Sequence, residues 1–294
     1  MPKMDGLTAL QRILLEAPCA VVMISSLTQE GALTTIEALE LGAVDFVGKP
    51  GGTISLGIKQ LQREIVSKVK AAAGAKLRRP AQPGRIAPPA GPVAARPAAR
   101  RGFKVVVIGV STGGPRTLMD ILPYLPDDLP AAVLLVQHMP ESFTASFAER
   151  LDRACRLAVK EAADGHELAP GRVLVARGGW HLKVVPGTNR RLVARLSRQP
   201  ADTLYFPSVD VTMRSVLEHV AARYVVGVLL TGMGSDGANG MVEIRKRGGY
   251  TIAEAEETAV VWGMPREAYL RGGAEVLAPS YHIAQRIVEG VYRG

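Results

Sequence analysis

Three polar residues with the chemistry of a hydrolytic triad each follow an apolar run that is typical of a buried strand. They are Ser111 after Val105–Gly109, His138 after Ala131–Gln137, and Asp236 after Val225–Thr231. A serine hydroxyl becomes a strong nucleophile when an imidazole takes its proton, and the imidazole needs a carboxylate that fixes its tautomer. Because ligands bind beyond the carboxyl ends of parallel strands, the three residues are predicted to converge on one crevice.

Each of the three residues also has an ordinary structural interpretation. Ser111 precedes a predicted helix and is a candidate helix cap, and His138 follows an apolar run and is a candidate core histidine. Asp236 is a candidate cap for the following helix, or a residue that holds the glycine-rich turn. Their joint occurrence at three predicted strand ends favours the catalytic interpretation.

The turn that carries Ser111 also fits the nucleophile elbow of α/β-hydrolases. Residues 109–113 read G-V-S-T-G and match G-x-S-x-G. In that family the acid precedes the histidine along the chain, whereas His138 precedes Asp236 here. His282 comes late enough in the sequence, but it lies in a predicted helix, where its spacing indicates packing or a surface position.

A phosphate-binding loop is a further interpretation of the same turn. Residues 109–114 resemble a degenerate G-x-G-x-x-G, but Ser111 takes the place of the middle glycine, and the next strand ends without an acid for a ribose. The histidines His166, His181 and His219 show no metal-ligand spacing. We therefore predict that the site needs neither a cofactor nor a metal.

The apolar pattern predicts two α/β regions joined by a linker. Helices and strands alternate in residues 1–73 and again in 103–294, which predicts a doubly wound, mostly parallel sheet in the second region. The predicted helices are Leu7–Glu16, Thr28–Leu41, Ser55–Ala73, Arg116–Leu125, Ser142–Cys155, Val209–Ala222, Gly237–Arg247, Met264–Arg271 and His282–Tyr292. Gly42 is predicted to cap the second of them. The predicted strands are Ala20–Ser25, Val44–Val47, Val105–Gly109, Ala131–Gln137, Arg156–Lys160, Arg172–Ala176, His181–Val185, Leu192–Leu196, Val225–Thr231, Thr251–Glu254 and Glu275–Leu277. The first of them is predicted to be buried.

Composition predicts a globular cytoplasmic protein. The 294 residues are 47% hydrophobic, without a long apolar run or a signal peptide, and the isolated Cys19 and Cys155 are predicted to be small core residues. The formal charge of +9 comes mainly from residues 74–102, which hold seven cations, six prolines and no acid. This segment is predicted to be an extended linker, so we expect neither nucleic acid nor a membrane as a partner.

Residues 1–73 resemble part of a response-regulator receiver domain. The matching features are the loop Met1–Leu7, a hydroxyl at Ser25 or Ser26, and Lys49-Pro50 after a strand. The resemblance implies a phosphoacceptor aspartate and an acidic cluster before residue 1, so both are absent from this chain. We hypothesise an internal start or a truncated gene, and we expect activity that a phosphate donor changes little.

Residues 103–294 resemble the CheB family of chemotaxis-receptor methylesterases. The matching motifs, in order, are I-G-V-S-T-G-G-P at 108–115, Q-H-M-P at 137–140, P-S-V-D at 207–210, T-G-M-G-S-D-G-A-N-G at 231–240 and G-M-P-R-E-A at 263–268. The resemblance implies that Ser111 is the nucleophile, His138 the general base and Asp236 the orienting acid. It also implies that Thr112 is an active-site neighbour and that the Met233 N–H is an oxyanion donor. Arg177 departs from a proline that is common in the family.

The resemblance further implies the reaction and its partners. The expected substrate is a glutamate γ-methyl ester on a helical receptor tail, hydrolysed with release of methanol, and deamidation of receptor glutamines is a related activity. A chemotaxis histidine kinase would act on an intact receiver domain. The alternative is an adaptor that keeps the fold and only holds receptor tails, but the presence of Ser111, His138 and Asp236 disfavours it.

Overall fold

A seven-stranded sheet forms the centre of the larger part of the molecule. The computed structural model describes residues 3–26, 28–49, 58–75, 103–188 and 191–293. The strands run in the order β11-β10-β9-β3-β4-β6-β5, and every pair of neighbours is parallel. Their bounds are β3 Lys104–Val110, β4 Ala131–Gln137, β5 Ala158–Glu161, β6 Arg172–Val175, β9 Val225–Leu229, β10 Tyr250–Glu254 and β11 Val276–Ala278. The predicted α/β class with a mostly parallel sheet is therefore confirmed.

Strand β3 lies between β4 and β9, although β9 follows β4 by almost a hundred residues. Val107 of β3 aligns with Leu134 of β4 on one side and with Gly227 of β9 on the other. The chain thus builds the sheet outward from β3 in one direction, and later returns to extend it in the other. A reversal of this kind leaves a crevice beyond the carboxyl ends of the central strands.

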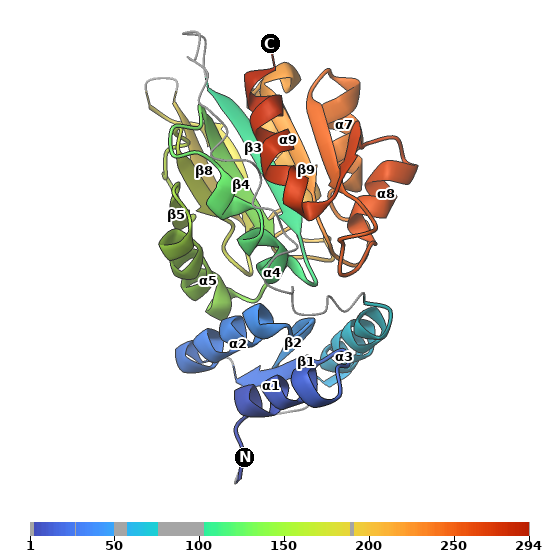
Figure 1. Cartoon of the computed structure of the whole chain (residues 1–294). Coiled ribbons are helices and arrows are strands. Elements are labelled where there is room, and N and C mark those ends of the chain that lie inside the picture. The colour runs from blue at the N-terminus through green and yellow to red at the C-terminus, as the bar shows by residue number, and fades with distance from the viewer. Residues whose placement is uncertain (1–2, 27, 50–57, 76–102, 189–190, 294) are drawn as a thin grey trace.

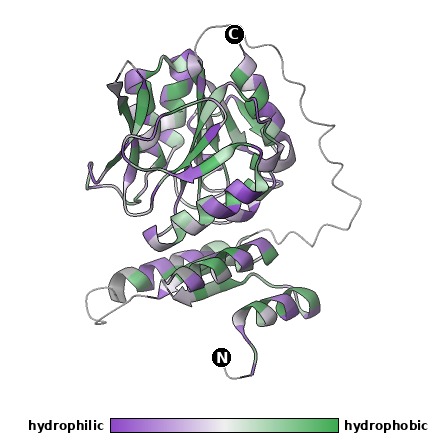
Figure 2. Cartoon of the chain, turned by 90° about the vertical axis from the view of Figure 1, so that its left-hand side faces the viewer, coloured by the Kyte–Doolittle hydropathy of each residue, from purple (hydrophilic) through white to green (hydrophobic). Residues whose placement is uncertain are grey.

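Helices cover both faces of the sheet (Figure 1). The helices α4 Gly114–Met119, α5 Glu141–Ala154 and α9 Ser280–Tyr292 contribute buried apolar residues to one face, and α6 Val209–His219, α7 Ala238–Lys246 and α8 Met264–Leu270 contribute to the other. An antiparallel hairpin, β7 His181–Pro186 with β8 Leu192–Ser197, packs on the second face. Figure 2 shows hydrophobic residues concentrated in the strands and hydrophilic residues on outward-facing turns of the helices. Among the described residues, no helix is long and apolar enough to cross a membrane.

The helix after β3 is shorter than its apolar spacing predicts. Helix α4 ends at Met119, and a separate 3-10 turn follows at Leu122–Tyr124. Pro123 lies in that turn and has no N–H group to continue a helical ladder, which accounts for the break. The four apolar residues that suggested the longer helix are nevertheless all buried, namely Leu118, Ile121, Leu122 and Leu125.

The N-terminal part contains two parallel strands and three helices. Their bounds are α1 Gly6–Glu16, β1 Val22–Ser26, α2 Gln29–Leu41, β2 Asp45–Lys49 and α3 Ile58–Ala73. Gly42 ends α2 with a φ of 127°, as predicted for the glycine at that position. The prediction that β1 is buried is wrong, because among the described residues β1 pairs only with β2, and Ile24 is 58% exposed. The prediction that Cys19 lies in the core is also wrong, since this residue is exposed, whereas Cys155 is half-buried.

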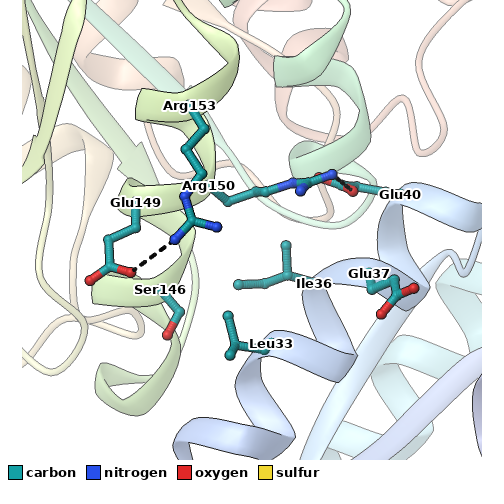
Figure 3. A pocket seen from close by; sticks show the side chains of 8 residues that line it. All are labelled: Leu33, Ile36, Glu37, Glu40, Ser146, Glu149, Arg150 and Arg153. Atoms are coloured by element: carbon teal, nitrogen blue, oxygen red, sulfur yellow. Dashed lines mark hydrogen bonds and ion pairs between the residues drawn. The ribbon is translucent and has the colours of Figure 1, made fainter.

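The N-terminal part packs against the carboxyl-end edge of the large sheet and the helices that follow it (Figure 1). The Phe46 and Phe143 rings lie 4.5 Å apart, and both residues belong to one apolar cluster that spans the two parts. Arg150 of α5 donates two hydrogen bonds, of 2.7 and 2.6 Å, to the Glu40 carboxylate of α2. Figure 3 shows Leu33 and Ile36 of α2 facing α5 across a cleft of about 330 Å³.

Replacing Phe46 with alanine tests this packing. Phe46 is only 3% exposed, so Phe46→Ala should lower the free energy of unfolding by about 3 kcal/mol, the usual cost of emptying an aromatic site in a core. A urea titration measures the change. Leu15→Ala is the control, because Leu15 is 77% exposed and should cost less than about 0.5 kcal/mol. Equal losses in the two variants would contradict the packing described.

Candidate functional site

The turn after β3 holds Ser111 in a fixed position by backbone contacts on both sides. The Ser111 N–H donates to the Thr231 carbonyl at 2.9 Å, and the Ser111 carbonyl accepts from the Gly114 N–H at 2.8 Å. Gly232 packs directly against the serine, because a Cβ at that position would lie 2.7 Å from the Ser111 Cβ. Any larger residue at 232 would displace the serine side chain.

Glycine at position 113 is what allows the chain to enter α4 immediately after the serine. Gly113 has a φ of 79° and forms the N-terminal cap of α4 without a side-chain hydrogen bond. A Cβ there would lie 2.5 Å from the Val260 Cβ, so the position is closed to other residues on steric grounds as well. Ser111 therefore does not cap α4, and its hydroxyl is not used for that purpose.

His138 leaves the end of β4 and pairs with Asp236. The His138 N–H donates to the Val110 carbonyl at 3.1 Å, which fixes the residue beside the tip of β3. Its Nε2 lies 2.8 Å from the Asp236 Oδ2, and both side chains are nearly buried. The imidazole face stacks on Tyr205, with ring centroids 4.1 Å apart and an angle of 10° between the planes. The ring is thus held at one edge and on one face.

The Asp236 carboxylate lies at the N-terminus of α6. It accepts hydrogen bonds from the Ser208 hydroxyl at 2.8 Å, the Val209 N–H at 2.7 Å and the Asp210 N–H at 3.1 Å. The N-terminal cap of α7 is Gly237, which makes no side-chain hydrogen bond, so Asp236 does not cap the helix that follows it. Free N–H groups and the helix dipole both favour a negative charge at such a position.

These contacts determine the ionisation of Asp236. Burial acts to raise the pKa of the carboxyl, but the hydrogen bond and charge of His138 and the backbone N–H groups of α6 outweigh burial and lower the pKa below its ordinary value. A carboxylate that stays ionised holds an N–H on the His138 Nε2. The other ring nitrogen, Nδ1, is then the one that can accept a proton. This Nδ1 is buried and has no hydrogen-bond partner among the described residues.

The structure thus brings His138 and Asp236 into contact and sets Ser111 at the neighbouring strand tip. Ser111 and His138 are not hydrogen-bonded to each other, since the one polar contact of the imidazole is with Asp236. Catalytic hydrogen bonds are often long before substrate binds. His282 is exposed near the start of α9 and takes no part in these contacts, as the surface interpretation predicted.

Thr112 and Met233, the two predicted neighbours of the nucleophile, both contact the N-terminal part. The Thr112 hydroxyl donates to the Asp45 Oδ2 at 2.5 Å, and the Ser67 hydroxyl lies 3.6 Å from the Met233 Sδ. Lys68 forms an ion pair with Asp45 at 3.3 Å. The Met233 N–H is the predicted oxyanion donor. This backbone group makes no hydrogen bond to another described residue.

Several residues around the site escaped the sequence analysis because they act through tertiary contacts. Gln137 donates to the carbonyls of Ser111 and His138, both at 3.1 Å, and so joins the two strand tips. The fully buried Glu254 accepts from the Thr231 N–H at 2.8 Å, and the Thr231 hydroxyl donates to the Thr112 carbonyl at 2.9 Å. These hydrogen bonds tie β9 and β10 to the turn that carries the serine.

His181 is a second buried histidine near Asp236, although its spacing in the sequence gave no sign of a role. Its Nδ1 accepts from the Ser208 N–H at 3.2 Å and its Nε2 donates to the Pro200 carbonyl at 3.0 Å. Burial lowers the pKa of His181, against the opposing effect of the Pro200 carbonyl. The neutral ring therefore positions Ser208, which in turn binds Asp236. Among the described residues, no three His, Cys, Asp or Glu side chains are grouped to hold a metal ion.

Comparison with known proteins identifies similar sequences over almost the whole chain. Residues 106–287 match the family model described as CheB methylesterase. A Caldanaerobacter subterraneus subsp. tengcongensis protein named protein-glutamate methylesterase/protein-glutamine glutaminase is 58% identical, over 99% of this chain and 82% of its own length. A Carboxydothermus hydrogenoformans protein, named protein-glutamate methylesterase/protein-glutamine glutaminase 2, is 54% identical over 98% of this chain and 83% of its own. The crystal structure of the Thermotoga maritima CheB methylesterase catalytic domain has 42% identity and a TM-score of 0.61, and the match covers 64% of this chain and 99% of that one.

Removing the Ser208 hydroxyl tests how far the site depends on the Asp236 contacts. Ser208→Ala deletes a hydrogen bond to the carboxylate and the side-chain cap of α6, so we expect a loss of about 1–2 kcal/mol in unfolding free energy. Turnover of a simple ester should fall about tenfold, because without this hydrogen bond Asp236 holds His138 less firmly in place. A tenfold lower rate corresponds to an activation barrier about 1.4 kcal/mol higher.

Thr28→Ala provides the matched control for that variant. Thr28 caps α2 by accepting from the Gly31 N–H at 3.1 Å and makes none of the described contacts of His138 or Asp236, so its loss should cost similar stability and leave ester turnover at the wild-type value. Urea titration and initial-rate assays measure the two effects. If Ser208→Ala retained full turnover despite the lost stability, the positioning role of Ser208 would be ruled out.

Proposed function

The chain belongs to the CheB methylesterase family, and from this premise we propose that it hydrolyses glutamate γ-methyl esters of proteins and deamidates protein glutamines. Relatives at 58% and 54% identity carry the names of both activities. The observation that supports a hydrolytic mechanism most directly is the 2.8 Å contact between His138 and Asp236 beside Ser111. We take residues 103–294 as the catalytic domain of this proposal.

In the proposed mechanism, the Ser111 hydroxyl attacks the carbonyl carbon of the ester while the His138 Nδ1 takes its proton. The Nε2–H of His138 stays bonded to Asp236, which stabilises the imidazolium that forms. The carbonyl π electrons move to oxygen and give a tetrahedral oxyanion. The Met233 N–H, which makes no hydrogen bond to another described residue, is our candidate for stabilising this charge.

Collapse of the tetrahedral intermediate breaks the bond to the leaving group. The oxyanion re-forms the carbonyl, the methoxy oxygen leaves and takes the proton from His138, and methanol is released from an acyl-serine. A water molecule then attacks the acyl carbon and gives a proton to His138. The bond between the acyl carbon and the Ser111 oxygen breaks, that oxygen takes the proton back from His138, and a glutamate is released. A glutamine side chain passes through the same steps and releases ammonia in place of methanol.

The substrates that fit the family are methyl-accepting chemotaxis receptors. We propose that the N-terminal part regulates access to the site, and that a histidine kinase is its partner in a protein with an intact receiver. This proposal is supported by the contacts of Asp45 with Thr112 and of Ser67 with Met233, because these bring the N-terminal part onto both neighbours of the nucleophile.

Replacing the nucleophile tests the proposal. Ser111→Ala should reduce methanol release from a methylated receptor by roughly 10³-fold or more, because a triad member provides transition-state stabilisation that binding alone does not replace. Gas chromatography of methanol measures the rate, and circular dichroism verifies the fold.

Ser146→Ala on α5 is the control, since Ser146 lies at the cleft between α2 and α5 and makes no contact with Ser111. It should release methanol at the wild-type rate. Activity of a folded Ser111→Ala protein within tenfold of wild type would remove Ser111 from the mechanism, whereas a wild-type chain that releases no methanol would favour a role in which the crevice only holds receptor tails.

A further inference from the structure

The Tyr205 side chain contacts two parts of the site that the proposed reaction uses together. One face of its ring stacks on the His138 imidazole, with centroids 4.1 Å apart and an angle of 10° between the planes. Its hydroxyl lies against the turn before Asp236, because a Cβ at Gly234 would be 3.2 Å from the hydroxyl oxygen. Gly234 directly follows Met233, whose N–H is our candidate oxyanion donor. One side chain thus packs on the proposed base and beside the proposed oxyanion donor.

The loop before α6 holds Tyr205 in place from both sides. The Thr203 hydroxyl donates to the Tyr205 carbonyl at 3.2 Å. The next residue, Phe206, stacks its ring on His181 with centroids 4.4 Å apart, and its carbonyl accepts from the Gly179 N–H at 3.0 Å. A side chain whose own backbone and neighbours are fixed in this way can in turn restrict the group on which it packs.

Two consecutive aromatic residues therefore stack on two histidines that both act on Asp236. His138 contacts the carboxylate directly, with 2.8 Å between Nε2 and Oδ2. His181 accepts from the Ser208 N–H at 3.2 Å, and the Ser208 hydroxyl donates to the carboxylate at 2.8 Å. The loop thus supports the carboxylate through one histidine and the imidazole of the other directly.

The stacked ring supplies what the Asp236 contact alone does not. A hydrogen bond at Nε2 holds one edge of the imidazole but leaves the ring free to turn about that contact, which would move Nδ1 away from Ser111. A ring packed on the imidazole face opposes this movement, and a misplacement of about 1 Å can cost about 100-fold in rate. The imidazole also becomes a cation when it takes the serine proton, and an aromatic face within about 6 Å attracts a cation.

We propose that Tyr205 is a positioning residue, which keeps the His138 Nδ1 directed at Ser111 and sets the distance between the imidazole and the turn that carries Met233. This inference rests on the proposed function, from which the roles of those three residues are taken. Tyr205 acts through the imidazole and not on the substrate. Its loss should therefore lower kcat and leave KM nearly unchanged.

Two replacements of Tyr205 test the inference in the full-length chain. Tyr205→Leu removes the aromatic ring, so kcat for methanol release from a methylated receptor should fall about tenfold while KM stays within about twofold of wild type. Tyr205→Phe keeps the stacked ring and removes only the hydroxyl beside Gly234, so it should retain about a third of the wild-type kcat. Labelling of Ser111 by a fluorophosphonate, which needs the imidazole but no receptor, should slow in the same order.

Tyr281→Leu is the matched control, because Tyr281 also packs on a histidine. Its ring lies 4.7 Å from that of His282 on α9, and neither residue takes part in the described contacts of the site. Removing this ring should leave kcat, KM and the labelling rate at their wild-type values. Circular dichroism verifies the fold of each variant.

The inference would be overturned by a Tyr205→Leu protein with the wild-type kcat, or with a loss confined to KM, which would mean that the ring binds substrate. A loss of more than tenfold in Tyr205→Phe would overturn it as well, because the stacked ring would then not be the decisive part. If the wild-type chain were labelled at Ser111 but released no methanol, the proposed function would fail. Tenfold slower labelling of Tyr205→Leu would in that case still support the positioning role.

Discussion

The proposed chemistry depends on one buried contact, the 2.8 Å hydrogen bond between His138 and Asp236. The contact joins residues that are 98 positions apart in sequence, and only the order of the sheet brings them together. The N-terminus of α6 stabilises the ionised form of Asp236, and the Tyr205 ring stacks on the face of the His138 imidazole. Because the carboxylate occupies Nε2, the remaining nitrogen of the ring is left for the serine. The central position of β3 between β4 and β9 is therefore what makes the proposed nucleophile, base and acid neighbours.

The N-terminal part adds a second constraint at the same edge of the sheet. The Gly113 N–H at the start of α4 donates to the Val44 carbonyl at 3.2 Å, and Thr112 donates to Asp45. Both contacts use groups within two residues of Ser111. The turn that carries the serine is thus also the place where the N-terminal part is attached, which links any movement of that part to the environment of the serine.

The sequence predicted those features that depend on local pattern. The bounds of β4 are the predicted ones, and Ser111, His138 and Asp236 lie beyond the ends of parallel strands as predicted, because apolar period and turn residues follow from short segments. The features it missed depend on distant partners. Tyr205 and His181 take their places only when the loop before α6 folds against β4 and β7, and nothing in their spacing reports that contact.

Two errors have similar causes. Ile24 and Cys19 have the residue types of a core, but the small sheet of the N-terminal part leaves them uncovered. Residue type predicts burial only where a second layer exists to provide it. The linker prediction falls on residues 76–102, and the start predicted for α3 at Ser55 falls on 50–57; both lie outside the described residues.

The most direct test of the account is covalent labelling with a fluorophosphonate, followed by mass spectrometry of the intact chain and its peptides. The account predicts one adduct, on Ser111, that a methylated receptor substrate slows by competition and that is lost in His138→Ala, because the hydroxyl needs the imidazole to react. An adduct on another residue, or labelling of Ser111 at the same rate without His138, would contradict the central claim that these residues act together.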